Sequence, residues 1–319
     1  MFLQADTLTD LYPLAIDALL RDGEPTSPRG IPTREILGAH LRIDQPRERI
    51  LAVEGRIPNP AFAVAEALWI LSGSDDGWIF DYNSQLVRYA DCGVLRGAYG
   101  PRLRRWGAQE DQLWRVVDLL LRDRDSRQAV VQIFDPARDW AGAKDVPCTV
   151  GHRFFVRSGR LHLHTTMRSQ DLWLGMPYDI FANTLLQELM AGWLGLEVGR
   201  YDHFVDSLHL YEHDVVEAEA VAPRARPRAA ATRSPSLSCK INELDVAIAG
   251  VLAGTGWNDD PAWRELADVL ASSRMWRAGQ RDGALRITER VGGNLGDALA
   301  RWYAKLGASV VERAASTTG

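Results

Sequence analysis

The segment RSQDLWLGMPYD, residues 168–179, lies between a proline–cysteine pair at Pro147-Cys148 and the triplet His209-Leu210-Tyr211. Together these segments supply a thiol, an arginine suited to binding an anion, two carboxylates and a polar pair. A surface segment or a purely structural core rarely needs that set in so short a run. We therefore take residues 145–214 as the centre of an enzyme active site, around which the rest of the chain is organised.

The composition indicates a globular protein. With 319 residues, 46% of them apolar, the chain can bury a sizeable core, as one large domain or as a domain with an appendage. The formal charge is −5 and the basic residues are spread along the chain, so we expect no polynucleotide partner. Residues 1–20 lack the regions of a signal peptide, and no apolar run reaches the roughly 18 residues of a membrane span. We expect no membrane partner and a cytoplasmic location.

The cysteines and histidines do not predict a metal site. Cys92, Cys148 and Cys239 are widely separated and odd in number, which argues against a disulfide framework and against zinc spacing. His162 and His164 share one face of a predicted strand because side chains alternate. No third ligand follows at a suggestive spacing, so we predict no bound metal.

Hydrophobic periodicity predicts a mixture of helices and strands. We expect helices at residues 5–21, 58–73, 111–122, 178–194, 262–277 and 297–313, with residues 239–253 helical or partly extended. We expect strands at residues 35–43, 129–134, 153–156, 160–166 and 198–211. Residues 25–32 are predicted to form a loop, and Tyr99-Gly100-Pro101 a turn within an irregular stretch, residues 78–106.

Some charged residues allow two interpretations. Glu66 lies in a strongly apolar helical segment, so it is either capped by an unseen partner or kept for acid–base chemistry. Asp179 lies at the entrance of the most apolar helix, where a carboxylate can also serve as an N-terminal cap. Arg29 and Arg34 are available to an anion, although arginines of this kind more often face water.

The composition changes after residue 221. Residues 222–238 are rich in Pro, Arg and Ala and are typical of a connector. We predict a catalytic domain at residues 1–221, this connector, and a helical C-terminal segment at residues 239–319 that packs on the catalytic domain. No catalytic residue is identified in the segment.

Taken in order, the motifs of residues 25–214 resemble those of the thymidylate synthase family, including its deoxycytidylate hydroxymethylase branch. They are Glu66-Ala67-Leu68-Trp69 ahead of Gly73, Tyr99-Gly100, Asp125-Ser126-Arg127, Pro147-Cys148, Arg168-Ser169-x-Asp171, Leu174-Gly175-x-Pro177 and His209-x-Tyr211. The resemblance implies an α+β fold with a mixed β-sheet at a homodimer interface, to which the C-terminal segment adds a helical extension.

The resemblance also implies covalent chemistry at a nucleotide base. A pyrimidine C5 is too weak a nucleophile to attack a one-carbon donor, so a thiolate must first add to C6. Cys148 matches that thiol, and we expect the nearby Arg168 to favour the thiolate. Cys92 and Cys239 are expected to be buried and inert. Glu66 matches the family's general acid–base residue, and Tyr99 should join its water network.

Ligand contacts are carried over in the same way. The resemblance assigns the 5′-phosphate to Arg168 and Ser169, with Arg29 or Arg34, and with Arg127 reaching across from the partner subunit of an obligate homodimer. The family often has a second arginine after Arg127, and here Gln128 stands in its place. The remaining assignments are the sugar 3′-hydroxyl to His209 and Tyr211, further nucleotide contacts to Gln170 and Asp171, and the folate to Asp171, Gly175 and Glu66.

Asp179 predicts the base. In thymidylate synthases this position is an asparagine, whose amide donates to uracil O4 and accepts from N3–H. An ionised aspartate cannot donate to O4, whereas it accepts from the 4-amino group of cytosine, whose N3 can be met by a shared proton. An unpaired buried polar group costs about 1–3 kcal/mol, so we expect the preference to move to cytosine.

Two further departures from the synthases indicate a hydroxymethyl product. Thr149 follows the nucleophile where the synthases usually have a histidine, and residues 315–319 are not the apolar closing tail that excludes water during hydride delivery. We predict a (deoxy)cytidylate 5-hydroxymethyltransferase that uses 5,10-methylenetetrahydrofolate, in nucleoside-antibiotic synthesis if it acts on CMP and in modified DNA if on dCMP. The alternatives are a C5 methyltransferase acting on dCMP or dUMP, and a non-catalytic nucleotide-binding protein.

Overall fold

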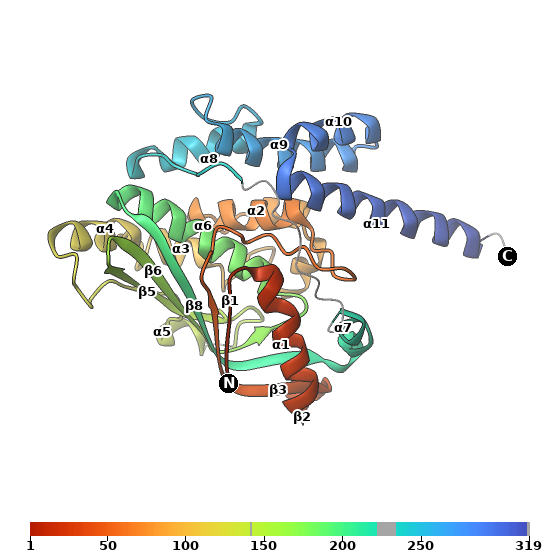
Figure 1. The fold of residues 1–319 in the computed structure, drawn as a ribbon, viewed down its shortest axis with the longest axis horizontal. Coiled ribbons are helices and arrows are strands. Elements are labelled where there is room, and N and C mark those ends of the chain that lie inside the picture. The colour runs from red at the N-terminus through yellow and green to blue at the C-terminus, as the bar shows by residue number, and fades with distance from the viewer. Residues whose placement is uncertain (141, 222–233, 318–319) are drawn as a thin grey trace.

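The computed structural model describes residues 1–140, 142–221 and 234–317, with the backbone alone for residues 309–317. Its centre is a mixed eight-stranded sheet in the order β1–β3–β8–β6–β5–β4, with β2 paired to β3 and β7 paired to β8 (Figure 1). The strands are β1 Phe2–Ala5, β2 Glu24–Thr26, β3 Thr33–Ile43, β4 Val130–Gln132, β5 Thr149–Arg157, β6 Arg160–Met167, β7 Gln170–Asp171 and β8 Glu197–Tyr211.

Most of the helices form two layers over one face of this sheet (Figure 1). The first layer contains α6 and α2, which pack against each other, and α6 also packs against β6 and β8. The second layer contains α9, which packs on α2. The helices are α1 Leu8–Asp22, α2 Pro60–Leu71, α3 Tyr99–Arg104, α4 Gln112–Arg122, α5 Pro136–Asp139, α6 Met176–Leu194, α7 Val215–Val221, α8 Leu244–Ala253, α9 Pro261–Arg277, α10 Arg281–Val291 and α11 Gly293–Thr317. No described helix is both long and apolar enough to cross a membrane.

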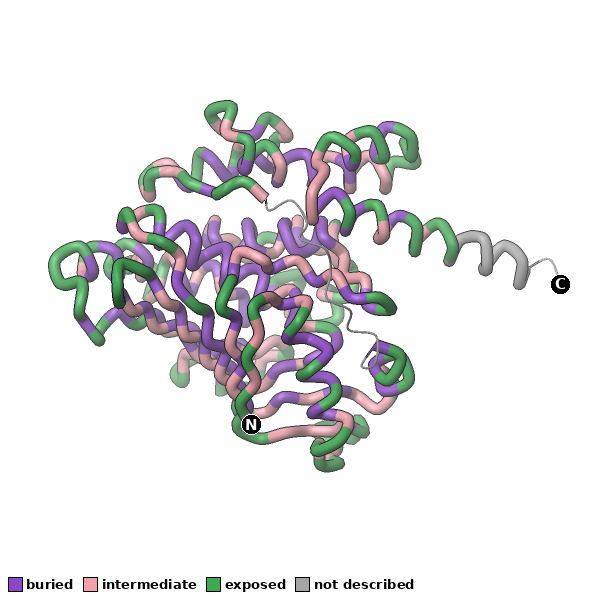
Figure 2. The backbone as a smooth tube through the Cα atoms, in the orientation of Figure 1, coloured by how far each residue is buried: buried purple, intermediate pink, exposed green. Residues whose placement is uncertain are grey.

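The central helix α6 is buried along almost its whole length, as the purple residues of Figure 2 show. It begins after Gly175 with Pro177 in its first turn, where the missing N–H of proline costs no helical hydrogen bond. It ends at Gly195, whose φ of 65° suits glycine. Each fully buried leucine or phenylalanine contributes about 1.5–3 kcal/mol, so α6 holds its first turn firmly in place.

The opposite face of the sheet is organised around Asp202, which has no solvent exposure. It is paired with His40 Nε2 at 2.6 Å, Arg42 Nε at 2.7 Å, His164 Nε2 at 3.3 Å and Arg200 Nε at 3.1 Å. Burial alone would raise the pKa of Asp202, but the hydrogen bonds from His164, Arg42 and His40 lower it. His164 is thus a partner of a buried carboxylate. The neighbouring His162 accepts a hydrogen bond from the backbone N–H of Arg200 at 3.1 Å.

The structure corrects four local predictions. Residues 2–5 form β1, which pairs in parallel with β3, so the first helix begins at Leu8 rather than at residue 5. Residues 24–26, partly inside the predicted loop, form β2. Tyr99-Gly100-Pro101 is not a turn, because its proline occupies the first turn of α3. The helix α10 was not predicted. Strand pairing with distant residues decides the first two cases, and local sequence carries no signal for it.

A buried carboxylate on α6 links the C-terminal helices to the sheet layer. Glu188 is 3% exposed and pairs with Arg47 Nε at 2.8 Å and Arg49 Nη2 at 2.5 Å. It also accepts a hydrogen bond from the backbone N–H of Leu237 at 3.1 Å. Residues 222–233 of the predicted connector lie outside the described residues, and residues 234–238 run past this carboxylate toward α8.

Replacing Glu188 tests this link. Glu188→Gln should lower the free energy of unfolding by about 3 kcal/mol, because the buried Arg49 and the half-buried Arg47 lose their counter-charge. Urea denaturation followed by circular dichroism measures the change. Asp17→Asn removes an exposed carboxylate from a surface pair with Arg21 and should leave the midpoint unchanged. Equal midpoints for the two variants would contradict the structural role of Glu188.

Candidate active site

The sheet brings the predicted nucleophile and the predicted anion ligand together. Cys148 directly precedes β5 and Arg168 directly follows β6, and these two strands are antiparallel with Thr149 opposite Met167. The backbone N–H of Arg168 donates to the carbonyl of Cys148 at 2.8 Å. Arg168 Nη2 lies 3.8 Å from Cys148 Sγ. The two side chains predicted from motifs are therefore in contact.

Arg168 also fixes the segment before the nucleophile. Its Nε donates to the carbonyl of Pro147 at 2.8 Å and its Nη2 to the carbonyl of Val146 at 2.9 Å. A guanidinium that bonds two successive carbonyls holds the loop in one conformation. The remaining N–H groups of the exposed side chain are free to face an anion.

The expected effect of Arg168 on the thiol is outweighed by burial. Burial raises the pKa of Cys148 to about 11, and Asp179 and Asp145 add to the rise, while Arg168 and Arg29 lower it. Arg168 acts in the predicted direction, because its charge lowers the pKa of the thiol, but burial raises that pKa by more. At neutral pH and without ligand, Cys148 is a thiol.

Glu66 projects from the middle of α2 toward the same region. Burial, and then the charge of Asp179, raise the pKa of its carboxyl to about 8. Among the described residues, its carboxyl has no hydrogen-bond or ion-pair partner. The structure thus offers no capping partner for Glu66 and favours the acid–base interpretation, because a carboxyl with this pKa holds a proton at pH 7.

Tyr99 lies beside the nucleophile loop. Its hydroxyl accepts a hydrogen bond from the backbone N–H of Thr149 at 3.3 Å. Burial raises its pKa, and the charges of Asp179 and Cys148 add to the rise, so the phenol stays neutral and lies near both groups. The Thr149 hydroxyl donates to Met167 Sδ at 3.0 Å.

Asp179 lies in the first turn of α6 and does not cap the helix, because the N-cap position belongs to Gly175. Its Oδ2 accepts a hydrogen bond from Gln170 Nε2 at 2.9 Å. Burial raises the pKa of Asp179 to about 6; the Gln170 hydrogen bond opposes the rise and the charge of Asp171 adds to it. Asp179 is therefore mostly ionised at pH 7, unlike Glu66.

The predicted sugar and phosphate residues meet at the end of β8. Ser169 Oγ lies 3.4 Å from His209 Nδ1. Burial and the charge of Asp171 raise the pKa of Tyr211, and the nearby charge of Arg29 lowers it. Arg29 therefore reaches the site. Arg34 pairs with Glu212 at 2.9 Å, so the two candidate arginines have different partners, and the choice between them as phosphate ligands stays a prediction.

Other predicted residues are placed as follows. Asp171 Oδ1 accepts from the backbone N–H of Leu174 at 2.8 Å, which fixes the carboxylate beside the start of α6. Arg127 is exposed between α4 and β4 and contacts no candidate site residue of its own chain in the described structure. Cys92 is exposed rather than buried, so that part of its prediction is wrong, while Cys239 is half-buried.

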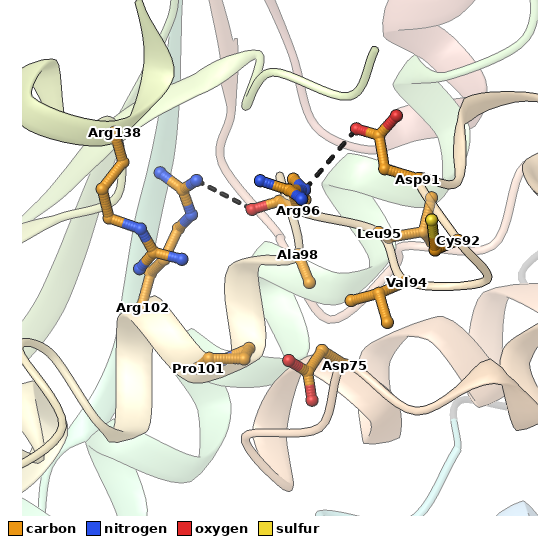
Figure 3. A pocket seen from close by; sticks show the side chains of 10 residues that line it. All are labelled: Asp75, Asp91, Cys92, Val94, Leu95, Arg96, Ala98, Pro101, Arg102 and Arg138. Carbon is orange, nitrogen blue, oxygen red and sulfur yellow. Dashed lines mark hydrogen bonds and ion pairs between the residues drawn. The ribbon is translucent and has the colours of Figure 1, made fainter. Parts of the chain in front are cut away.

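A hollow of about 380 Å³ lies beside Cys92. Figure 3 shows the side chains that line it, among them Cys92, Asp91 and Arg96. None of the predicted site residues lines this hollow. Arg102 at its edge forms a buried pair with Asp139 at 2.6 Å, which supports the loops around it. We interpret the hollow as separate from the chemistry at Cys148.

Sequence reasoning missed several residues around the site. Asn59 caps α2 by accepting from the backbone N–H groups of Ala61 and Phe62, and its own N–H donates to the hydroxyl of Tyr178 at 3.0 Å. The asparagine before Pro60 is a recognisable cap signal. His203 lies beneath Gln170, with its Nε2 2.9 Å from Gln170 Oε1. A buried histidine on a strand carries no such signal.

A family model described as thymidylate synthase matches residues 10–247, so the chain belongs to the thymidylate synthase family. This confirms the resemblance and the α+β fold class. The chain is also similar to a deoxyuridylate hydroxymethyltransferase of Bacillus phage SP01, with 38% identity over 220 residues. That match covers 65% of this chain and 57% of the relative, so it spans little more than half of the relative's length.

The state of the Cys148 thiol can be tested by alkylation. In a Cys92→Ser, Cys239→Ser background, the rate of reaction with iodoacetamide should rise roughly tenfold for each pH unit between pH 7 and 9.5. The raised pKa keeps the thiolate a minor species throughout that window. A rate that levels off below pH 9 would contradict the burial effect.

A pair of arginine variants isolates the contribution of Arg168. Arg168→Met should slow alkylation at every pH, because it removes the nearest positive charge. Arg34→Met removes a guanidinium that pairs with Glu212 instead, so its rates should match those of the parent. Equal rates for both variants would show that Arg168 does not stabilise the thiolate.

Proposed function

We propose that this protein transfers a one-carbon unit to C5 of a cytidine monophosphate, dCMP or CMP, and releases the 5-hydroxymethyl product. The proposal rests on one observation: Asp179, at the start of α6, lies close enough to both Cys148 and Glu66 for its charge to raise the pKa of each. A binding protein needs no thiol beside an unpartnered acid, so this grouping favours catalysis over simple binding.

Methylenetetrahydrofolate is the one-carbon donor of the family, and it supplies a carbon at the oxidation level of formaldehyde. The side chains fit such a donor. Asp171 offers a carboxylate to the N–H groups of its ring system, and Glu66 offers an acid without a partner among the described residues. Gly175 keeps the backbone beside them free of a side chain.

The chain's own residues have distinct roles in the proposed reaction. Cys148 Sγ bonds to C6 of the base, and the electron pair of the C5–C6 double bond makes C5 nucleophilic. Arg168, 3.8 Å from the sulfur, stabilises the thiolate as it forms. C5 then bonds to the one-carbon unit of the donor. Loss of the C5 proton expels the amine nitrogen of the donor, which takes a proton from Glu66, and leaves an exocyclic methylene at C5. Water adds to that methylene while Glu66 accepts a proton from it, and departure of the Cys148 sulfur from C6 restores the C5–C6 double bond.

Asp179 supports cytosine as the base. Its carboxylate accepts a hydrogen bond from the 4-amino group, and its raised pKa of about 6 lets it share a proton with N3 near neutral pH. Uracil is the second candidate, since the similar phage protein is named for deoxyuridylate. Only the protonated form of Asp179 can donate to uracil O4.

We also propose a homodimer in which Arg127 completes the phosphate site of the partner subunit. In its own chain Arg127 is exposed and away from Cys148. The sheet face around Asp202 carries half-buried Phe155 and Phe204, and His40 stacks on Phe204 with 4.2 Å between ring centroids. A flat aromatic face of this kind suits a twofold interface.

Replacing the Asp179 carboxylate by an amide tests the base preference. Asp179→Asn should shift the ratio of kcat/KM for cytidylate over uridylate toward uridylate by roughly 5- to 150-fold, because the amide can donate to O4. Product mass after incubation with CMP, dCMP or dUMP and the folate measures it. No movement of the ratio would remove the main reason for choosing cytidylate.

Subunit complementation tests the shared site. Cys148→Ala and Arg127→Ala should each abolish turnover alone, whereas co-expressed chains should recover about a quarter of wild-type activity, since half of the dimers contain one complete site. Size-exclusion chromatography confirms that mixed dimers form. If mixed dimers form and stay inactive, Arg127 acts in its own chain or not at all.

A further inference from the structure

A buried row of polar side chains leads from the core to Asp179. Asn183 Nδ2 donates to the hydroxyl of Tyr201 at 3.0 Å, and that hydroxyl lies 2.7 Å from His203 Nδ1. His203 Nε2 lies 2.9 Å from Gln170 Oε1, and Gln170 Nε2 donates to Asp179 Oδ2 at 2.9 Å. Tyr201 and His203 have no solvent exposure and Gln170 has 2%. The row joins α6, β8 and β7 beneath the proposed base site.

The amide of Gln170 has only one satisfactory orientation. Its Nε2 lies within hydrogen-bond distance of two acceptors, Asp179 Oδ2 at 2.9 Å and the carbonyl of Asp171 at 3.3 Å. An amide nitrogen donates twice and accepts nothing, so it fills both places. The opposite orientation would set an oxygen against two acceptors. Its Oε1 therefore faces His203.

This orientation fixes every hydrogen along the row. Because Oε1 only accepts, His203 carries its ring hydrogen on Nε2 and presents a lone pair on Nδ1. The Tyr201 hydroxyl then donates to Nδ1 while it accepts from Asn183. Burial, and then the charge of His152, lower the pKa of His203 to about 3, so the ring is neutral with a single hydrogen. All four hydrogen bonds point toward Asp179.

There is little room for the hydrogen bond between Gln170 and Asp179 to shift. A Cβ built on Gly175 would lie 3.0 Å from Gln170 Nε2 and 3.4 Å from Asp179 Oδ2. The backbone of Gly175 thus closes the remaining side of the contact. The amide is held between the strand β7, the ring of His203 and the start of α6.

We propose that Gln170, oriented by His203, is a positioning residue for base recognition. Its amide N–H keeps Asp179 Oδ2 as a hydrogen-bond acceptor. Oδ1 is then the atom that shares a proton with N3 of the base. An oxygen that already accepts an N–H bond is the poorer site for a proton, so the proton goes to the other oxygen. Oδ2 keeps a lone pair for the 4-amino group. This inference rests on the proposed function. It adds the reason why the two oxygens of the Asp179 carboxyl differ in their hydrogen bonds to the base.

Several ionisable groups surround Asp179, and the Gln170–Asp179 hydrogen bond acts on the pKa of Asp179 in their presence. They come from every element around it: Glu66 of α2, Tyr99 of α3, Cys148 before β5, Asp171 of β7 and Tyr201 of β8. Burial and the charge of Asp171 make a proton on Asp179 easier to add, and the Gln170 hydrogen bond opposes this. Removal of the Gln170 hydrogen bond should therefore raise the pKa of Asp179.

Gln170→Met keeps an unbranched side chain of similar length and removes the donor. Two measurements follow the change. In the ligand-free protein, the pKa of Asp179 seen by carboxyl ¹³C NMR should rise above its wild-type value. In the assay, the ratio of kcat/KM for cytidylate over uridylate should fall about tenfold. His203→Leu, which frees the amide to rotate, should lower the same ratio, and His203→Gln, which retains a donor, should restore part of it.

A matched core variant separates the effect of the Gln170 hydrogen bond from an effect on stability. Leu208 is the fully buried strand neighbour of Gln170, and Leu208→Val should lower the free energy of unfolding without changing the Asp179 pKa or the ratio. An unchanged Asp179 pKa in Gln170→Met overturns the inference, as does an equal loss of the ratio in Leu208→Val. If the wild type turns over only uridylate, the proposed substrate is wrong, and the ligand-free pKa still decides whether Gln170 ties Oδ2.

Discussion

Burial of ionisable groups between α2, α6 and the sheet is the constraint on which the candidate site depends. It is the largest influence on Cys148, Glu66 and Asp179, and it raises the pKa of each. The order of these values, about 11 for the thiol, 8 for Glu66 and 6 for Asp179, sets the protonation state at neutral pH. A thiol, a neutral acid and a carboxylate then stand side by side, each ready for a different step.

The fold creates this environment with ordinary packing. The buried face of α6 fixes the turn that carries Asp179, and the neighbouring strands β5 and β6 set Cys148 against Arg168. On the far face of the sheet, Asp202 takes four cationic or histidine partners, so that buried carboxylate is stabilised in its charged form. The same sheet thus holds one carboxylate that is fully paired and another, Asp179, that has a single donor.

Motif order was enough to predict the family and the contact between Cys148 and Arg168, and hydrophobic periodicity was enough to predict the main helices α2 and α6. It could not give the net state of the thiol, because the depth of burial depends on packing by segments far apart in the sequence. Arg29 and Arg34 are equivalent in sequence, whereas in the structure Arg34 pairs with Glu212 and Arg29 lies near Tyr211. No sequence pattern singled out His203, because it acts on Asp179 only through Gln170, a contact that the fold creates.

Base recognition and activation of the nucleophile are linked through charge in the proposed reaction. The ionised Asp179 raises the pKa of Cys148, so it opposes formation of the thiolate while its charge is unpaired. A base that donates its 4-amino hydrogen and shares a proton with Asp179 offsets that charge and thereby lowers the pKa of the thiol. The linkage is reciprocal, so a thiolate at Cys148 favours a protonated Asp179. A base that leaves the carboxylate unpaired gains no such activation, so Asp179 discriminates in the bond-forming step as well as in binding.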